Sequence, residues 1–244
     1  MKKTLAMILA GGRVDELSVL TLYRPKSALP FGGMYRVIDF PLSNLMHSGI
    51  ERIGILSQYR SDSLITHIGS GRSWDMVGSQ RGVHLLPPMK GTVSSDWYRG
   101  TADAVYQNKE FVYRHNPDYV LILSGDHVYK MDYAEMIAFH EEVKADVTVA
   151  FVNAEGDGLD RFGQGVIEDG HSKGGRLLRY VEKPSQPLSS WASMTIYLFS
   201  LSALQYVLDE MMKPPATEHF GRDILPVLLE KKRVFGYKFH GAWA

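Results

Sequence analysis

Tyr119-Val120-Leu121-Ile122-Leu123-Ser124-Gly125-Asp126-His127 is the stretch that decides the fold of this chain. Its five successive apolar residues predict a strand buried on both faces, as in a parallel sheet covered by helices, although a short buried helix would show the same pattern. The chain can turn at Ser124 and Gly125, so Asp126 would lie at the carboxyl end of the strand, where open α/β sheets bind ligands. Because Mg²⁺ is usually held by one or two carboxylates together with substrate phosphates, Asp126 is a candidate magnesium ligand.

The composition describes a globular chain without an overall charge. Its 244 residues are 45% hydrophobic and 22% charged, which is enough for the full core of one large α/β domain. Lys plus Arg and Asp plus Glu both total 27, so no overall field attracts nucleic acid or an anionic membrane, and we expect neither as a partner. The absence of cysteine excludes a disulfide scaffold and thiolate metal sites, and it fits a reducing cytosol.

The amino-terminal sequence imitates a secretion signal but does not fit one. The apolar residues 4–10 barely reach the length of a signal h-region, and they end at Gly11. No apolar stretch approaches the ~20 residues that are needed to cross a bilayer. We therefore expect a cytoplasmic protein.

A glycine turn near the start of the chain is a candidate phosphate cradle. Residues 5–9 predict a short buried strand that ends in Ala10, Gly11 and Gly12, where backbone N–H groups can approach a phosphate closely. An ordinary turn between a strand and a helix has the same pattern, so the turn carries little weight alone.

Two later turns add weight to the phosphate-binding interpretation. Residues 23–33 place Arg24 and Lys26 in a proline-punctuated loop that suits neither a helix nor a central strand, and cations held there are candidates for phosphate contacts. Gly100 precedes a predicted helix with Thr101 as its N-cap, and a glycine at this point can present backbone donors to a ligand.

The remaining sequence alternates between strand and helix patterns. Further strands are predicted at residues 52–56, 83–86, 146–152, 193–199 and 234–239. Helices are predicted at residues 39–48, 61–68, 101–113, 133–143, 201–212 and 223–230. The sum predicts a mostly parallel, doubly wound α/β sheet of about seven strands, to which the second half adds antiparallel strands as a substrate-binding subregion.

Seven segments, which follow in family order and are distributed over nearly the whole chain, carry a resemblance to a known family. They are residues 9–12, 24–44, 97–108, 124–133, 181–184, 192–197 and 220–226. The chain resembles the catalytic domain of the nucleotidyltransferases that make sugar nucleotides, and most closely the bacterial ADP-glucose pyrophosphorylases. WYRGTADAVYQN at 97–108 and SGDHVYKMDY at 124–133 are more diagnostic than the glycine turn.

The resemblance implies a fold and a reaction. Residues 1–244 would form one catalytic-type nucleotidyltransferase domain, Rossmann-like, with an inserted sugar-binding subregion. The phosphate of glucose 1-phosphate would attack the α-phosphorus of ATP in line, with Mg²⁺ as cofactor, giving pyrophosphate and the ADP-glucose used in glycogen synthesis. Two anions must meet in that step, so catalysis would rest mostly on positioning and on neutralising charge.

The resemblance also implies roles for individual residues. Asp126 would hold the Mg²⁺ and Lys26 would neutralise phosphate. The nucleotide would be bound at Leu9, Ala10, Gly11, Gly12, Arg13, Gly100, Thr101 and Asp103. The sugar phosphate would be bound at Tyr98, Glu182, Lys183 and Ser193. In this second group the Glu182 carboxylate would accept hydrogen bonds from glucose hydroxyls.

Each assignment has a plainer alternative. Lys26 and Lys183 could be solvated surface lysines, and Asp126 could merely cap a turn. His127 is better suited to orient its neighbour than to bind Mg²⁺, which prefers oxygen ligands. Tyr98 could equally belong to the packing of a loop or the core.

The first loop departs from the family sequence Gly-Gly-x-Gly-x-Arg-Leu. Val14 stands where a glycine is expected, and Glu16 stands where the family has an arginine that binds the triphosphate. An anion in place of a cation repels a polyphosphate, and losing one charge-stabilising contact typically costs on the order of 10²–10³ in rate. Arg13 could take over part of this role. Thr195 also replaces a glycine of the family pattern.

The chain ends at Ala244, before the family's second Mg²⁺-binding aspartate and before the left-handed β-helix domain that the resembling enzymes use for oligomer contacts and allosteric control. From this we expect either an excised catalytic domain or a shortened paralogue, with a homo- or hetero-oligomer as the full-length form.

The sequence leaves three hypotheses about function. The first is an active adenylyltransferase. The second, favoured by Glu16, is a catalytically impaired homologue that binds nucleotide or sugar phosphate and regulates an active partner subunit. The third is a transferase for another base or sugar, because Met89 stands near the place where the family carries a glutamine beside the nucleobase.

Overall fold

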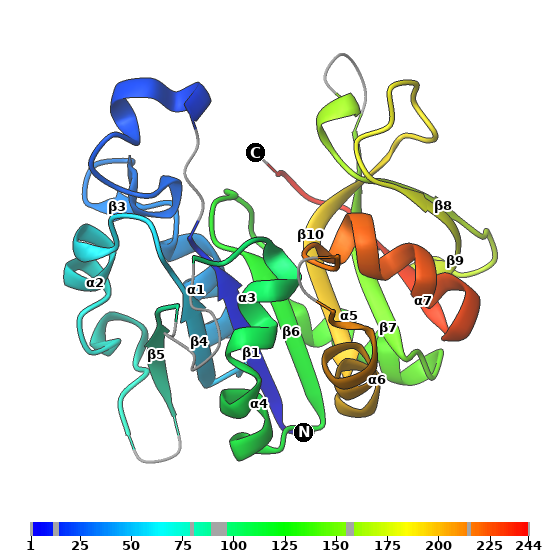
Figure 1. The fold of residues 1–244 in the computed structure, drawn as a ribbon, viewed down its shortest axis with the longest axis horizontal. Helices are drawn as coiled ribbons and strands as arrows, with labels where there is room; N and C mark the ends of the chain where they lie inside the picture. Colours follow the sequence, from blue (N-terminus) through cyan, green and yellow to red (C-terminus); the bar gives the residue numbers. More distant parts are fainter. Residues whose placement is uncertain are drawn as a thin grey trace.

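The computed structural model describes residues 2–11, 15–78, 81–88, 97–154, 159–213 and 216–243. Within these ranges nine strands form one sheet, in the order β5-β4-β1-β6-β10-β7-β11-β9-β8 (Figure 1). The strands are β1 (Thr4–Leu9), β4 (Arg52–Leu56), β5 (Gly82–Leu86), β6 (Tyr119–Ser124), β7 (Val147–Asn153), β8 (Gln164–Ile167), β9 (Gly174–Val181), β10 (Trp191–Ser200) and β11 (Val234–Phe239). β6 pairs with β1 on one side and with β10 on the other, so it joins the two halves of the sheet.

Helices cover both faces of this sheet. One face carries α1 (Asp39–His47), α2 (Asp62–Ile68) and α5 (Tyr133–Glu142). The other face carries α3 (Thr101–Gln107), α4 (Lys109–His115), α6 (Leu201–Tyr206) and α7 (Leu225–Lys231). Single turns of 3₁₀ or π type are Asp15–Leu20, Lys26–Ala28, Arg72–Trp74, Leu159–Arg161, Val207–Met211 and Phe220–Ile224. None of the described helices is long and apolar enough to cross a membrane.

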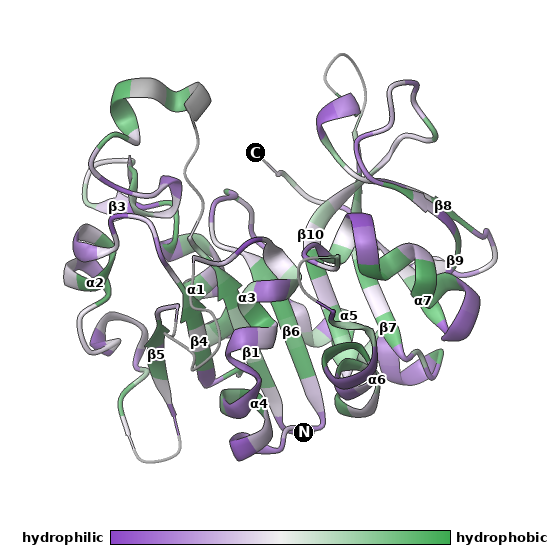
Figure 2. Cartoon of the chain, viewed as in Figure 1, coloured by the Kyte–Doolittle hydropathy of each residue, from purple (hydrophilic) through white to green (hydrophobic). Residues whose placement is uncertain are grey.

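The uninterrupted apolar run of β6 explains the two layers of helices. Successive side chains of a strand point to opposite faces, so a strand between two helical layers must be apolar on both. Leu121 and Leu123 belong to the core beneath α1 and α5, whereas Val120 and Ile122 belong to the core beneath α3 and α4. Figure 2 shows the same hydrophobic character along β1, β4 and β6.

The sheet is mixed, with nine strands among the described residues where about seven were predicted, and all of them except β9 and β10 run in the same direction. Parallel pairing joins β5, β4, β1 and β6, and it joins β7 to β11. Antiparallel pairing joins β10 to β6 and to β7, and it joins β9 to β8 and to β11. The expectation that antiparallel strands enter in the second half of the chain is confirmed.

Glycines hide β8 and β9 in the sequence. In a sequence glycine signals a turn, but inside a strand it can mark a place where another backbone approaches closely. A Cβ on Gly174 would lie 2.0 Å from the carbonyl oxygen of Gly236, and one on Gly175 would lie 1.9 Å from that of Glu168. The glycines of β9 are therefore required for its close pairing with neighbouring segments, although in the sequence the same glycines suggest a turn and not a strand.

The predicted helix over residues 101–113 is two helices. α3 ends at Gln107 and α4 begins at Lys109, with the buried Asn108 between them. The Asn108 Nδ2 donates to the carbonyl of Ala104 and to the hydroxyl of Tyr98, both at 2.9 Å. These side-chain hydrogen bonds compete with the helical pattern and turn the chain. The remaining predicted strands and the helices α1, α2 and α5 are confirmed to within a few residues.

The central position of β6 predicts a large effect of truncating its core side chains. Leu121 is completely buried, so Leu121→Ala should lower the free energy of unfolding by about 2–5 kcal/mol through lost burial and a residual cavity. Leu178 on β9 is 58% exposed, and Leu178→Ala should cost no more than about 0.5 kcal/mol. Urea denaturation of both variants measures the two values, and equal costs would contradict the assigned burial.

Candidate active site

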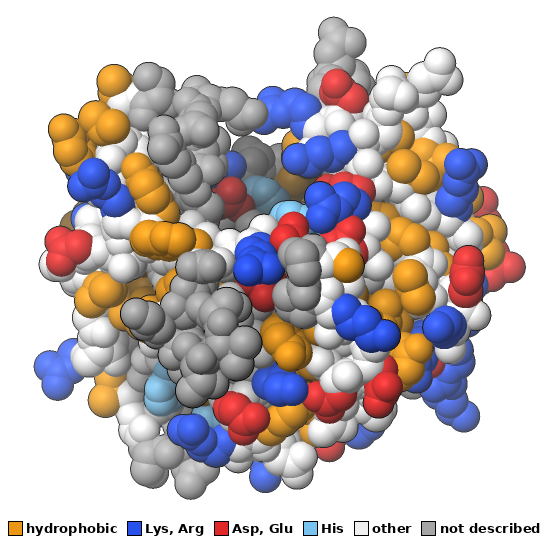
Figure 3. All heavy atoms as spheres, in the orientation of Figure 1, with side chains coloured by type: hydrophobic (Ala, Val, Ile, Leu, Met, Phe, Trp, Pro, Cys, Tyr) orange, Lys and Arg blue, Asp and Glu red, His pale blue; other side chains and the backbone are white. Residues whose placement is uncertain are grey.

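A cavity of about 300 Å³ opens at the carboxyl ends of the parallel strands β1, β4 and β6. The last residues of these strands, Leu9, Leu56 and Ser124, line it. We call it the first cavity. It lies where β1 pairs with β4 on one side and with β6 on the other, which is the kind of position where α/β sheets bind ligands. Figure 3 shows a hollow in this part of the molecule, with Lys and Arg side chains along its rim.

The glycine turn after β1 forms one wall of the first cavity. Ala10 and Gly11 line it, and the backbone N–H of Ala10 donates to the carbonyl of Leu56 at 2.9 Å. This bond continues the pairing of β1 with β4 and brings the turn to the edge of the sheet. Gly12 and Arg13 lie outside the described residues, as do Val14 and the side chain of Glu16.

Gly100 and Thr101 form a second wall. A Cβ on Gly100 would lie 2.4 Å from the carbonyl oxygen of Glu218, so only glycine allows this approach. Gly100, and not Thr101, is the N-cap of α3. The prediction of Thr101 as the cap is wrong, because its hydroxyl is engaged across the molecule, where it accepts the backbone N–H of Phe220 at 3.1 Å.

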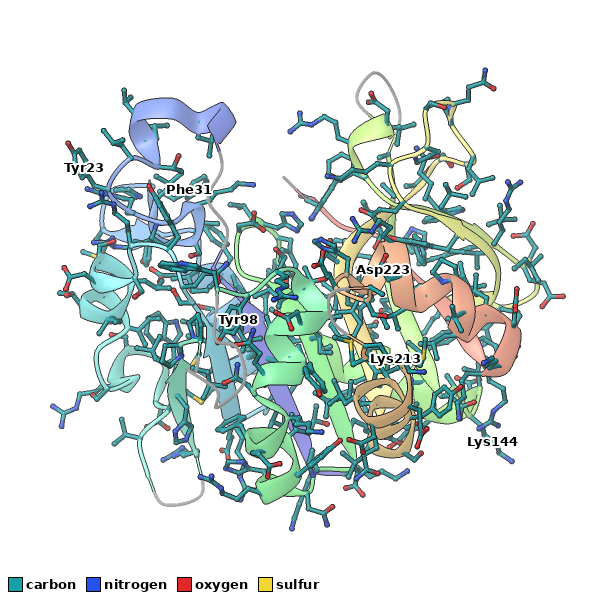
Figure 4. All side chains as sticks on the ribbon, viewed as in Figure 1. Tyr23, Phe31, Tyr98, Lys144, Lys213 and Asp223 are labelled. Atoms are coloured by element: carbon teal, nitrogen blue, oxygen red, sulfur yellow. The ribbon has the colours of Figure 1, made fainter. Side chains whose placement is uncertain are left out.

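Tyr98 lies in the wall of the first cavity, away from the other residues predicted to bind the sugar phosphate. Figure 4 shows it beside α3, on the side opposite Asp223. Its hydroxyl donates to the carbonyl of Leu86 at 2.8 Å and accepts from Asn108, and burial raises the pKa of Tyr98 to about 12. These contacts make Tyr98 part of the packing around the cavity.

Asp103 and Gln58 hold the turn that carries Tyr98. The buried Asp103 carboxylate accepts the backbone N–H of Arg99 at 3.0 Å, and it is not among the residues that line the cavity. Gln58 Oε1 accepts the backbone N–H of Tyr98 at 2.5 Å, and Gln58 does line the cavity. Gln58 was not predicted as a site residue, although a polar residue two positions after the end of a buried strand could have indicated it.

Lys26 and Asp126 meet in the first cavity. The Lys26 Nζ lies 3.3 Å from the Asp126 Oδ2, and Ser124 Oγ donates to the Asp126 Oδ1. The loop that carries Lys26 forms a 3₁₀ turn and a two-stranded sheet of β2 (Pro30–Phe31) and β3 (Tyr35–Arg36), so it contains neither a long helix nor a central strand, as predicted. Ser27 fixes it, because its buried carbonyl accepts the backbone N–H of Ile38 at 2.9 Å.

The surroundings of Asp126 favour its ionised form. Burial alone would raise the pKa of Asp126, but the charges of His127 and Lys26 and the hydrogen bond from Ser124 outweigh it and hold the pKa below its usual value. Burial, together with the charge of Lys26, lowers the pKa of His127. Asp126 is therefore a carboxylate at neutral pH.

A second cavity of about 450 Å³ adjoins the first. The two share the lining residues Thr101, Ser124, Asp126, Thr195 and His219. The predicted residues Glu182, Lys183 and Ser193 line the second cavity. The structure therefore brings Lys26, Asp126 and Lys183 to one continuous hollow, although they are far apart in the chain.

Two residues of the second cavity have a strained backbone. Lys183 has φ +46° and Thr195 has φ +55°, a region that residues other than glycine rarely adopt. Lys183 directly follows Glu182 after the end of β9, and Thr195 lies at an irregularity of β10 between Ser193 and Tyr197. Such residues cost on the order of 1–3 kcal/mol each and cluster at functional sites.

Several lining residues of the second cavity were not predicted as site residues. They are Arg161, Phe162, Gly163, Tyr180, Thr195, Tyr197, His219, Gly221 and Arg222. The two arginines lie in 3₁₀ and π turns whose positions depend on the folded chain, so no spacing in the sequence indicates them. For Thr195 a signal exists, because a β-branched residue stands there in place of the family's glycine.

Comparison with known proteins identifies the family of this chain. The model of the family described as nucleotidyl transferase matches residues 5–244. The chain belongs to the nucleotidyl transferase family. Among curated relatives, proteins named glucose-1-phosphate adenylyltransferase are 43% identical in Desulfitobacterium hafniense (strain Y51), 45% in Clostridium perfringens (strain SM101 / Type A) and 44% in Geobacillus stearothermophilus.

These matches extend over 99% of this nucleotidyl transferase chain and over 60–62% of the relatives. The chain thus spans about three fifths of the length of the curated relatives that it matches.

Asp223 stabilises the segment that carries His219 into both cavities. Burial alone would raise the pKa of Asp223, but hydrogen bonds from Arg222 and from the backbone N–H groups of Glu218 and His219 lower it to about 2. Because this pKa is depressed from 3.8, the stabilisation is complete above about pH 4 and is lost as the pH falls toward 2.

We therefore expect Asp223→Asn to lower the melting temperature at pH 7 by a few degrees. The difference from the parent should shrink between pH 4 and pH 2, where Asp223 itself becomes protonated. Thermal unfolding at a series of pH values measures it. A difference that stays constant down to pH 2 would contradict the assigned hydrogen bonds.

Proposed function

We propose that this chain binds ATP in the first cavity and glucose 1-phosphate in the second, and that it transfers AMP between them to give ADP-glucose and pyrophosphate. The observation that carries the proposal is the meeting of the two cavities at Asp126, with Lys26 on one side and Lys183 on the other. The names of the curated relatives support the choice of substrates.

The topology of the first half supports ATP in the first cavity. We infer a Rossmann-like, doubly wound arrangement for β5, β4, β1 and β6, because the chain builds outward from β1 to β4 and β5 and then returns to place β6 on the other side. A nucleotide would lie at this reversal, with its phosphates against the backbone at Ala10, Gly11 and Gly100.

The residues at the junction fit a magnesium ion that is held partly by its substrates. No group of three or more His, Asp or Glu residues suited to a metal is found among the described residues. Mg²⁺ does not require one, since one or two carboxylates with substrate phosphates and water complete its shell. Asp126 would supply the carboxylate, and the ion would supply positive charge between the phosphates of the two substrates.

Charge neutralisation is what the chain's own residues contribute to the transfer. Negative charge grows on the oxygens around the reacting phosphorus, and fixed cations in a water-poor site stabilise it. Lys26 would shift from Asp126 to phosphate oxygens of the nucleotide, and Lys183 would hold the phosphate of the sugar. Glu182, which lines the second cavity, would accept hydrogen bonds from the sugar hydroxyls.

We also propose a compartment, an assembly and partners for this protein. We expect the protein to work in the cytoplasm as a homo- or hetero-oligomer, with ATP and the sugar phosphate as its ligands and without nucleic acid or a membrane as partner. The identity of the base is tested by competition among ATP, UTP and dTTP.

Pyrophosphate release from ATP and glucose 1-phosphate with Mg²⁺ tests the proposed transfer. We expect slow turnover by the parent chain, because Glu16 stands where the resembling enzymes have an arginine for the triphosphate. Glu16→Arg should raise the rate by on the order of 10²-fold, since it restores a charge-stabilising contact. Lys26→Met and Asp126→Asn should abolish turnover in both backgrounds.

The outcomes separate the candidate functions. Turnover that Glu16→Arg does not improve would show that residue 16 does not face the triphosphate. Tight binding of either ligand without turnover in any variant would favour the homologue that regulates an active partner subunit. Failure to bind both ligands in calorimetry would overturn the proposal.

A further inference from the structure

Thr195 stands at the boundary between the two cavities. It is one of the residues that line both, and it has a β-branched side chain at φ +55°. Glycine would adopt this backbone conformation without strain, so the threonine keeps its side chain at the boundary at a cost in stability. An outlier of this kind at a ligand cavity calls for a functional explanation.

A hydrogen bond holds Thr195 in place. Its backbone N–H donates to the Ser193 Oγ at 3.3 Å, across the irregularity of β10. This bond fixes the backbone that carries the Thr195 side chain at the boundary of the two cavities.

Thr195 shares the second cavity with Tyr180, Tyr197 and Glu182. The Tyr180 hydroxyl donates to the Glu182 Oε2 at 2.6 Å. This contact is tightly enclosed, since a Cβ on Gly221 would lie 2.1 Å from that carboxylate oxygen. Thr195 thus lines the same cavity as the carboxylate that would recognise the sugar.

We propose that the Thr195 side chain acts as a steric wedge between the two cavities. It keeps the sugar phosphate in the second cavity apart from the nucleotide in the first. The inference rests on the proposed function, since it assumes that the two cavities bind those ligands. The wedge makes simultaneous binding unfavourable, because the phosphates of the two ligands must approach each other past its side chain. In this chain the two ligands therefore bind with negative coupling, and each weakens the other by the same factor.

Calorimetric titration of glucose 1-phosphate, with and without saturating α,β-methylene-ATP and Mg²⁺, tests the wedge. This analogue binds as a nucleoside triphosphate but cannot transfer AMP. In the parent chain we expect it to raise the Kd of glucose 1-phosphate at least fivefold. In Thr195→Gly the change should be less than twofold, and Thr195→Val, which keeps the bulk but not the hydroxyl, should behave as the parent.

A matched control separates the wedge from relief of strain. Lys144 also has a positive φ, +50°, and Figure 4 shows it far from Tyr98 and Asp223. Lys144→Gly should therefore relieve backbone strain in the same way but leave the fivefold coupling unchanged. Thermal unfolding of each variant checks that it is folded.

The wedge and the proposed function fail in different ways. If both ligands bind the parent chain without antagonism, or if Thr195→Gly keeps the parent's antagonism, the wedge is overturned and the two binding sites stand. If Thr195→Val loses the antagonism as fully as Thr195→Gly, the hydroxyl and not the bulk is responsible, which also overturns it. Failure of every variant to bind glucose 1-phosphate alone overturns both inferences.

Discussion

The ion pair between Lys26 and Asp126, 3.3 Å long, is the contact on which the candidate site depends. It joins a surface loop to the end of the central strand and keeps a cation and an anion together where both would be needed for phosphate chemistry. An exposed pair would contribute little, but these side chains are only 33% and 28% exposed, so their charges are less screened. The sheet supports this contact, because the carboxyl ends of β1, β4 and β6 line the same cavity as the ion pair.

The second half of the chain completes the site with a different construction. There β8 forms antiparallel pairs with β9 and with β10. Of the two strained residues, Lys183 lies just after the end of β9, and Thr195 lies at the irregularity of β10. The first half contributes strand ends, the turn at Ala10 and Gly11 and the charged pair of Lys26 and Asp126, whereas the second half contributes Glu182 and Lys183.

Elements with a strong internal pattern could be predicted from the sequence. The apolar runs of β1, β6 and β7 and the clear breaks around α1 and α5 are local signals, and the structure has these elements where they were expected. The parallel or antiparallel direction of β10 is not encoded locally, since it follows from how distant segments pack. β8 and β9 were not predicted, because their glycines suggest turns in the sequence but allow close contacts with other strands in the structure.

The candidate site shows the same contrast between local and distant information. Lys26, Asp126, Glu182 and Lys183 lie in segments whose resemblance to a family could be recognised, and all four line the two cavities. Tyr98 and Asp103 lie in an equally recognisable segment, but hydrogen bonds to their neighbours occupy them. His219 could be assigned to the cavities only from the folded chain, because its place depends on contacts with other segments, whereas the position of Gln58 just after β4 was a local signal.

The close approach of Gly100 to Glu218 ties the two halves mechanically. The Glu218 carbonyl accepts the backbone N–H groups of Ala102 and Asp103, at 2.8 and 3.2 Å, so a segment from the end of the chain is fastened to the first turn of α3. The rims of both cavities therefore share one point of attachment, at the Glu218 carbonyl. Residues 218–220 therefore cannot shift away from the amino end of α3 without breaking these two hydrogen bonds.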